Sequence, residues 1–209
     1  MYRLGLIFSI LATFFCTSFH IDKEVFSSFN EKYSILFVGN SLTYTNDLPK
    51  LVKEEAKKKG IKVSVEMLAY PNYAIEDHWN EGKVQKLIRS KKYDYVIVQQ
   101  GPSSQSEGRN ILFSSGKKYS DLCKLKNIKL CYFMVWPAKS NYHTFDKVIQ
   151  NYTDAATQNQ AMLLPVGNVW KSYIDSTNNW DYYSEDAFHP SLKGSKVAAT
   201  VIINELFLK

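Results

Sequence analysis

Apolar runs of strand length alternate with amphipathic stretches of helix length from residue 34 to the end of the chain. This alternation is typical of a parallel sheet covered by helices, and it predicts the α/β fold class. Five strands are predicted at 34–38, 61–69, 93–99, 129–136 and 161–166, the last closed by Gly167. Helices are predicted from a cap at Asn46 or Asp47 to Gly60, and at 75–88, 111–126, 145–158 and 192–207. The almost wholly apolar run 93–99 is expected at the centre of the sheet.

The length and composition favour a single domain. A chain of 209 residues with 45% hydrophobic residues can bury one sizeable core but not two ordinary enzyme domains. The net charge of +6 comes largely from short solvated lysine runs such as 57–59, and no nucleic-acid-reading motif accompanies it. We therefore expect no nucleic-acid partner, whereas attraction to an anionic surface or polysaccharide stays open.

The first residues resemble an export signal. Arg3 supplies a positive start, and residues 4–15 form an apolar run that is too short to span a bilayer comfortably. Cleavage after Ser18 would give a signal peptide at 1–18 and a soluble protein, which we favour, whereas lipid attachment at Cys16 would tether the chain to a membrane. A third reading is an uncleaved, buried N-terminal helix. The mature domain is expected at 30–209, exported to the periplasm, the medium or the envelope.

The remaining cysteines, Cys123 and Cys131, are too few for a disulfide framework and are predicted to be core thiols. No Cys/His cluster has the spacing of a zinc site, so no structural metal is expected.

A serine follows the first predicted strand directly. In parallel sheets ligands gather at the loops after the carboxyl ends of the strands, and Ser41 lies in such a strand-to-helix turn. This location suits a nucleophile, with backbone N–H groups of the turn available to an oxyanion. Gly39 to Ser41 is a weak signal by itself, because turns are rich in Gly, Asn and Ser for conformational reasons.

An Asp/His pair lies just before the last predicted helix. A serine nucleophile needs a general base whose imidazole is oriented by a carboxylate, and Asp186 and His189 on one loop have the residue types and spacing for this role. The alternative is that Asp186 caps a turn and His189 orders Pro190 and the final helix. Because Thr43 replaces the second glycine of a Gly-x-Ser-x-Gly elbow, an α/β-hydrolase is not favoured.

These segments together resemble the conserved blocks of the SGNH (GDSL-type) hydrolases, in a bacterial branch of that family. The resemblance runs in order from about residue 34 to the end of the chain. The matching segments are 38–43 (VGNSLT) with 46–49 (NDLP), 74–79 (AIEDHW), 94–104 (DYVIVQQGPSS), 134–137 (MVWP) and 186–191 (DAFHPS).

The resemblance implies a three-layer α/β/α sandwich with a five-stranded parallel sheet, related to the flavodoxin-like folds, and ester hydrolysis through an acyl-enzyme without metal or cofactor. It assigns Ser41 as nucleophile, His189 as general base and then acid, and Asp186 as its orienting partner. The oxyanion hole would combine Ser41 with Asn72, which replaces the usual glycine of the second block. The third block has no Asn, so Gln99 or Gln100 is expected to supply that amide.

Other residues compete less well for a role in catalysis. His78, beside Asp77, is expected to pack the helix or line the pocket rim. Aromatic side chains near predicted strand ends are mostly packing, although some must line any pocket. These are Tyr44, Tyr70, Tyr73, Trp136, Trp180, Tyr182 and Tyr183.

The sequence therefore predicts an exported serine esterase that cleaves small acyl esters, with acetyl esters on carbohydrate as one candidate. Two alternatives stay open: an acyltransferase with the same triad, and a catalytically silent domain that binds a glycan or a protein. The missing third-block Asn motivates the silent domain.

Overall fold

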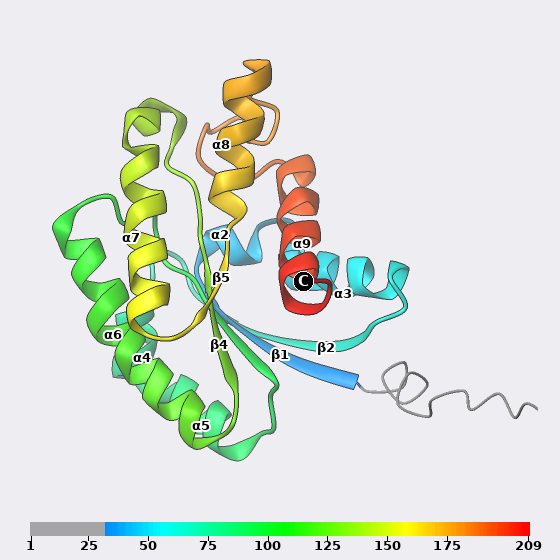
Figure 1. Cartoon of the computed structure of the whole chain (residues 1–209), viewed down its shortest axis with the longest axis vertical. Coiled ribbons are helices and arrows are strands. Elements are labelled where there is room, and N and C mark those ends of the chain that lie inside the picture. Colours follow the sequence, from blue (N-terminus) through cyan, green and yellow to red (C-terminus); the bar gives the residue numbers. More distant parts are fainter. Residues whose placement is uncertain (1–31) are drawn as a thin grey trace, which may run out of the picture.

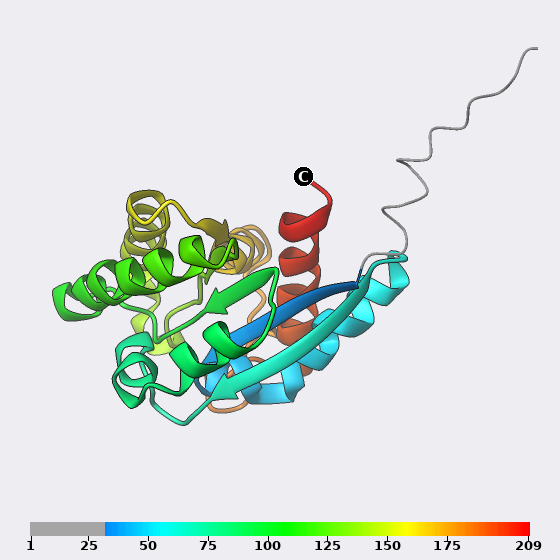
Figure 2. The same ribbon diagram turned by 90° about the horizontal axis from the view of Figure 1, so that it is seen from below.

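The computed structural model describes residues 32–209, which form a twisted parallel sheet covered by helices on both faces (Figures 1 and 2). The sheet has five strands in the order β2-β1-β3-β4-β5, and every neighbouring pair is parallel. The strands are β1 (Lys32–Gly39), β2 (Lys62–Ala69), β3 (Tyr95–Val98), β4 (Lys129–Phe133) and β5 (Met162–Leu164). The predicted α/β sandwich is confirmed, and the apolar run that forms β3 lies at the centre of the sheet.

Helices α3 and α9 lie on one face of the sheet and α4 to α7 on the other (Figure 1). The helices that follow β1 and β2 are α2 (Ser41–Tyr44), the 3-10 turn η1 (Thr45–Asp47), α3 (Leu48–Lys58), α4 (Ile75–Glu81) and α5 (Lys83–Ser90). The later ones are α6 (Ser106–Leu125), the 3-10 turn η2 (Lys139–Thr144), α7 (Phe145–Gln158), α8 (Val166–Thr177) and α9 (Leu192–Phe207).

Local chemistry explains where helix α3 begins and ends. The Asp47 side chain accepts a hydrogen bond from the Lys50 N–H at 3.4 Å, and Pro49 occupies the first turn, where its missing N–H costs nothing. Gly60 follows the helix with φ of +75°, a conformation that side-chain-bearing residues rarely adopt. The predicted cap and stop of this helix are therefore confirmed.

Three predicted boundaries were wrong. The helix expected at 75–88 is broken into α4 and α5 at Gly82, whose φ is +77°. Helix α6 begins five residues before its expected start at 111. Gly167 does not close a strand but lies in the first turn of α8, which was not predicted. A Cβ there would lie 2.5 Å from the Val135 carbonyl oxygen, so this glycine permits close packing of the helix on the chain after β4.

Buried strand residues and large aromatic side chains form the core. Trp136 and Trp170 stack with ring centroids 3.5 Å apart, and both are fully buried. Cys123 and Cys131 are free thiols inside this core, as predicted, and burial raises the pKa of Cys123 to about 12.

Within residues 32–209 no helix is both long and apolar enough to cross a bilayer. The predicted export signal at 1–18, its alternative at Cys16 and the first residues of the expected domain lie outside the described residues.

Candidate active site

Ser41 is the first residue of α2, just beyond the carboxyl end of strand β1, which lies between β2 and β3 in the sheet. The side chain of Asn40 caps this helix, because its Oδ1 accepts a hydrogen bond from the Leu42 N–H at 3.1 Å. N–H groups in the first turn of a helix have no acceptor within the helix. The Ser41 N–H is therefore available to a negatively charged oxygen near the Ser41 hydroxyl.

Gln99, at the end of β3, and Asn40 hold each other through reciprocal hydrogen bonds. The Asn40 N–H donates to Gln99 Oε1 at 2.9 Å, and Gln99 Nε2 donates back to Asn40 Oδ1 at 3.0 Å. Gln99 Oε1 also accepts from the Thr43 hydroxyl at 2.8 Å, and Nε2 also donates to the Gln100 carbonyl at 2.6 Å. Both amide hydrogens of this buried side chain are thus donated within the protein.

Gln100 is likewise engaged by its own loop. Its Nε2 donates to Ser103 Oγ at 2.8 Å and to the Gly108 carbonyl at 3.0 Å, and Ser103 Oγ donates onward to the Gly101 carbonyl at 2.8 Å. In this arrangement neither glutamine has an amide hydrogen to spare for an oxyanion. The sequence-based assignment of Gln99 or Gln100 to the oxyanion hole therefore stays a prediction, and a donating role would require the loop to rearrange.

Asn72 occupies the loop after β2 with φ of +61°, a left-handed conformation that Asn tolerates better than most residues. This is consistent with an asparagine in the place of the second-block glycine. The next residue, Tyr73, accepts a hydrogen bond at its carbonyl from Asn40 Nδ2 at 3.0 Å. Asn40 therefore ties the serine turn to the second loop as well as to Gln99.

Asp186 and His189 are brought together on the loop before α9. His189 Nδ1 lies 2.5 Å from Asp186 Oδ2, while Asp186 Oδ1 accepts from the Ser184 hydroxyl and from the N–H groups of Phe188 and His189 at 2.7, 3.0 and 2.9 Å. These bonds, led by that of the His189 ring, hold the pKa of the Asp186 carboxyl well below its usual range. An ionised Asp186 fixes the Nδ1–H tautomer, which leaves His189 Nε2 as a proton acceptor.

The rest of the chain positions this loop near Ser41. Trp136 Nε1 donates to the Phe188 carbonyl at 3.0 Å, and the Lys139 N–H donates to the Ala187 carbonyl at 2.9 Å. Asn46, just after α2, donates from Nδ2 to the Pro190 carbonyl at 3.0 Å. The segment that carries the serine is therefore bonded to the residue that follows His189.

Ser41 and His189 are at the same edge of the sheet but do not share a hydrogen bond. Within residues 32–209, neither Ser41 Oγ nor His189 Nε2 has a hydrogen-bond partner. Catalytic hydrogen bonds often tighten only when a substrate is bound, so both groups remain candidates.

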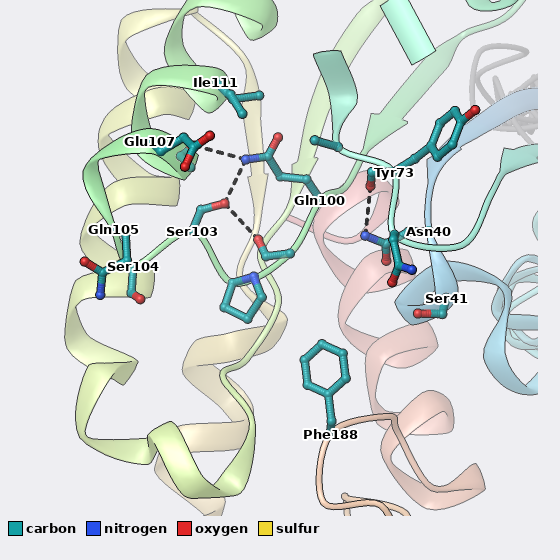
Figure 3. A pocket seen from close by; sticks show the side chains of 15 residues that line it. Asn40, Ser41, Tyr73, Gln100, Ser103, Ser104, Gln105, Glu107, Ile111 and Phe188 are labelled. Carbon is teal, nitrogen blue, oxygen red and sulfur yellow. Dashed lines mark hydrogen bonds between the residues drawn. The ribbon is translucent and has the colours of Figure 1, made fainter. Parts of the chain in front are cut away.

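A pocket of about 430 Å³ opens at Ser41 (Figure 3). Its walls come from the loops after β1, β2 and β3, the start of α6, and Phe188 beside His189. Figure 3 shows Ser41 and Phe188 at one end of the pocket and Ser104, Gln105 and Glu107 at the other. The three loops that the family's first three blocks would supply thus meet the loop of its last block at one cavity.

Sequence reasoning missed three residues of this site. Asn40 connects the first three loops, Phe188 lines the pocket, and Glu107 places a carboxylate at the exposed rim. Asn40 and Phe188 lie beside predicted catalytic residues, so their positions in the motifs were a usable signal. Nothing in the local pattern marked Glu107, because the start of α6 was misplaced.

His78 is part of the core and does not line this pocket. It is fully buried, and its Nε2 lies 2.8 Å from the Gly39 carbonyl oxygen while its ring stacks on Tyr70. Burial lowers the pKa of His78 below the ordinary 6.5, which keeps the ring neutral and donating. The expectation that His78 packs its helix is confirmed.

Several other predicted candidates are packing residues. Trp136, Tyr182 and Tyr183 are buried in the core, whereas Tyr73 lines the pocket. Residues 32–209 contain no cluster of three or more His, Cys, Asp or Glu side chains arranged to hold a metal ion.

Solved structures resemble this chain over most of its length. Neither a protein-family model nor a curated protein matches the sequence. A candidate SGNH hydrolase from Slackia heliotrinireducens is 21% identical, with a TM-score of 0.70 over 84% of this chain and 100% of the other. A lipase/acylhydrolase from Enterococcus faecalis is 17% identical, with a TM-score of 0.66 over 83% and 95% of the two chains.

A variant of an acetylxylan esterase from Geobacillus stearothermophilus is also similar, with 13% identity and a TM-score of 0.68 over 85% of this chain and 95% of the other. At these identities the likeness concerns the fold. The order of strands, the loop positions and the structural neighbours agree with the motifs, and the chain has the fold of the SGNH hydrolases.

Proposed function

We propose that the protein is a serine ester hydrolase that cleaves small acyl esters through an acyl-enzyme. One observation carries the proposal: the serine at the start of α2 and the Asp186–His189 pair lie at one edge of the sheet, beside one pocket. The imidazole is held by the carboxylate at Nδ1 and is unengaged at Nε2 among the described residues. This is the arrangement that a serine nucleophile requires of its base.

The reaction follows from these positions. His189 Nε2 removes the proton from Ser41 as Oγ attacks the ester carbonyl, and the resulting oxyanion is held by the N–H groups of Ser41 and Asn72. Collapse of this intermediate breaks the bond to the alcohol, which leaves with the proton from His189. Water then gives a proton to His189 as it attacks the acyl-enzyme carbonyl. The bond from the acyl carbon to Ser41 Oγ breaks, Oγ takes that proton back from His189, and the acid is released.

The third donor of the oxyanion hole is a separate question, because the Gln99 and Gln100 amides are engaged. Asn40 Nδ2 donates one hydrogen to the Tyr73 carbonyl, and its second hydrogen has no acceptor among residues 32–209. Asn40 also lines the pocket. The Asn40 side-chain amide is therefore the best candidate for the third donor of the oxyanion hole, the role that the missing third-block Asn would fill.

The pocket favours a short acyl group on a polyhydroxylated alcohol. Its volume of about 430 Å³ is at the small end for ligand sites. Polar groups of Ser104, Gln105 and Glu107 line the outer part, which suits sugar hydroxyls better than a long aliphatic chain. The Glu107 carboxylate also disfavours an anionic substrate at that position. Acetyl esters on carbohydrate fit this chemistry.

A fluorophosphonate probe tests the proposal directly. The wild-type protein should be labelled at Ser41, Ser41→Ala should not be labelled, and Ser104→Ala, which removes a pocket serine that lies away from the proposed nucleophile, should be labelled normally. Mass spectrometry locates the modified residue. Absence of labelling in the folded wild type would refute a serine nucleophile.

Two observations favour a second candidate, a catalytically silent domain that binds a glycan. Both glutamine amides are engaged, and Ser41 Oγ makes no hydrogen bond to His189. In that case acetylated oligosaccharides should bind, with saturable calorimetric heats, without being cleaved. An acyltransferase would instead be labelled and would transfer acetyl to added sugar faster than to water.

We also propose, from the sequence of residues 1–18, that the protein is exported.

A further inference from the structure

Basic residues gather at the amino end of the sheet, opposite the end that carries Ser41. Strands β1, β2 and β4 each begin with a lysine, and Lys91 and Lys92 shortly precede β3. Crossover helices of a parallel sheet run against the strands, so their last turns lie at this end too. The basic residues of those last turns are Lys57 and Lys58 in α3, Arg89 in α5 and Lys124 in α6.

Part of this basic end is a groove with a volume of about 620 Å³ between α3 and the starts of β1 and β2. Its charged lining consists of five lysines and a single carboxylate, Glu54, over a floor that includes Ile61 and Val63. The lysines are Lys32, Lys50, Lys53, Lys57 and Lys62. Within residues 32–209, Lys32, Lys53 and Lys57 are exposed and form no salt bridge. Their charge is therefore available to an external anion.

Exposed leucines lie at the same end. Leu125 is 82% exposed at the end of α6, between Lys124 and Lys126. Leu208 is 55% exposed just beyond α9, whose last residue, Phe207, contacts Tyr33 at the start of β1 with ring centroids 4.8 Å apart. Apolar side chains surrounded by lysines are typical of surfaces that contact the headgroup region of anionic membranes.

The opposite end has no comparable excess of lysine, because acidic residues there offset the basic ones. Helices that follow strands begin at the carboxyl end of the sheet, and the first turns of α4, α6 and α7 contain acidic residues, namely Glu76, Asp77, Glu107 and Asp146. The loop of Asp186 lies there as well. A molecule with this charge separation orients near an anionic surface with its basic end inward.

The chain itself enters the domain at the basic end. Residues 1–31 precede Lys32, and they include the apolar run at 4–15, which we predict to be part of an export signal that is either removed after Ser18 or retained. About 16 residues separate that run from Lys32, a stretch that reaches at most about 55 Å when fully extended. Any engagement of the run with a bilayer would therefore keep the basic end of the domain close to it.

From these features we infer that the lysine groove and the exposed leucines at the amino end of the sheet dock on a bilayer of anionic phospholipids, so that the Ser41 pocket faces away from the membrane. The docking itself does not depend on the proposed esterase activity. Lipid phosphates supply the negative charge, and each lysine near such a surface strengthens binding by roughly fivefold at low salt.

Vesicle sedimentation of the full chain tests the docking. Vesicles of phosphatidylglycerol mixed equally with phosphatidylcholine are compared with vesicles of phosphatidylcholine alone, for the wild type and two triple variants. The patch variant carries Lys32→Gln, Lys53→Gln and Lys57→Gln. The matched control carries Lys118→Gln, Lys147→Gln and Lys196→Gln, three exposed lysines outside the groove. Circular dichroism and urea unfolding check that all three proteins are folded.

We expect the patch variant to bind the mixed vesicles roughly a hundredfold more weakly than the wild type, and the control variant to lose little. Added salt should weaken wild-type binding, because it screens exposed charges. Equal binding of the patch and control variants would overturn the inference. Equal binding of the wild type to both kinds of vesicle would also overturn the inference. Binding to soluble polygalacturonate but not to vesicles would overturn it as well, and would make an anionic polysaccharide the partner.

The orientation is tested on vesicle-bound protein. Fluorophosphonate labelling of Ser41 should proceed as fast on the vesicles as in solution. Labelling in solution that stops on vesicles would refute the outward orientation. Absence of labelling in both settings would refute the proposed function and leave the docking result intact.

Discussion

Replacing Gln99 by methionine should destabilise the protein strongly and disable Ser41, although Gln99 touches no substrate. Methionine keeps the length and approximate volume of the side chain but has no amide. Its thioether leaves the buried Asn40 N–H and the buried Thr43 hydroxyl without the acceptor that Gln99 Oε1 provides.

The expected magnitude follows from counting the groups that lose every partner. The Asn40 side-chain oxygen keeps the Leu42 N–H, and the Gln100 carbonyl keeps the Tyr152 hydroxyl, so neither becomes unsatisfied. Two donors remain orphaned, and each costs about 1–3 kcal/mol. We therefore expect a loss of about 2–6 kcal/mol, a large part of the typical 5–15 kcal/mol for a domain.

Urea unfolding followed by tryptophan fluorescence measures this loss, with Gln105→Met as the matched control. Gln105 is exposed at the pocket rim, so its replacement should change stability by less than about 0.5 kcal/mol. In Gln99→Met the rate of fluorophosphonate labelling at Ser41 should fall even where the protein is folded, because the serine turn is no longer tied to β3. A stability within about 1 kcal/mol of wild type would show that the Gln99–Asn40 bonds do not hold the site.

Three further predictions concern single residues of the site. Burial lowers the pKa of His78, so below about pH 6.5 the unfolded chain takes up a proton that the folded chain does not. As the pH falls below about 6.5, the free energy of unfolding should therefore decrease by up to about 1.4 kcal/mol per pH unit. Urea titrations of His78→Gln should lack this pH dependence. Asp186→Asn should slow p-nitrophenyl acetate turnover by roughly 10²–10⁴-fold while the protein stays folded, whereas an unchanged rate would remove Asp186 from the mechanism. Asn46→Gly keeps the left-handed backbone of φ +57° but loses the side-chain hydrogen bond to the Pro190 carbonyl. Fluorophosphonate labelling of Ser41 should slow about tenfold, with a decrease in the free energy of unfolding of only about 1–2 kcal/mol. An unaltered labelling rate would show that the Asn46–Pro190 bond does not position His189.

The sequence was sufficient to predict the order of strands, because buried parallel strands leave continuous apolar runs. Helices α7 and α9 begin and end at the predicted residues, since each has a well-marked amphipathic stretch with clear flanks. Gly82 was read as a helical residue, although its left-handed φ breaks the chain between α4 and α5. The apolar residues carried a signal of this break, because in one continuous helix Val84 and Ile88 would lie on the side opposite Ile75.

The site was predicted less completely than the fold. Ser41, Asp186 and His189 could be proposed because each stands in a short motif of fixed spacing. The partners of Gln99 and Gln100 could not, because their hydrogen bonds run to Asn40, 59 residues away, and to the Gly108 carbonyl at the start of a helix whose first turn was missed. A missing motif residue shows that a donor is absent, but only the folded hydrogen bonds show which amides are already engaged.

The order of the sheet explains why the final helix is essential to the site. Strand β5, the last in the chain, lies at the edge farthest from β2, with β4 and β3 between it and β1. The chain must therefore return across the molecule before His189 can approach Ser41. It does so on the face where α9 packs beside α3, and there Asn46 bonds both the Pro190 carbonyl and the Ser195 hydroxyl at 3.0 Å. Because Asn46 joins the serine segment to α9 while Trp136 and Lys139 hold the other side of the His189 loop, local opening of α9 would loosen that loop on its Ser41 side while β1, β3 and β4 remain paired.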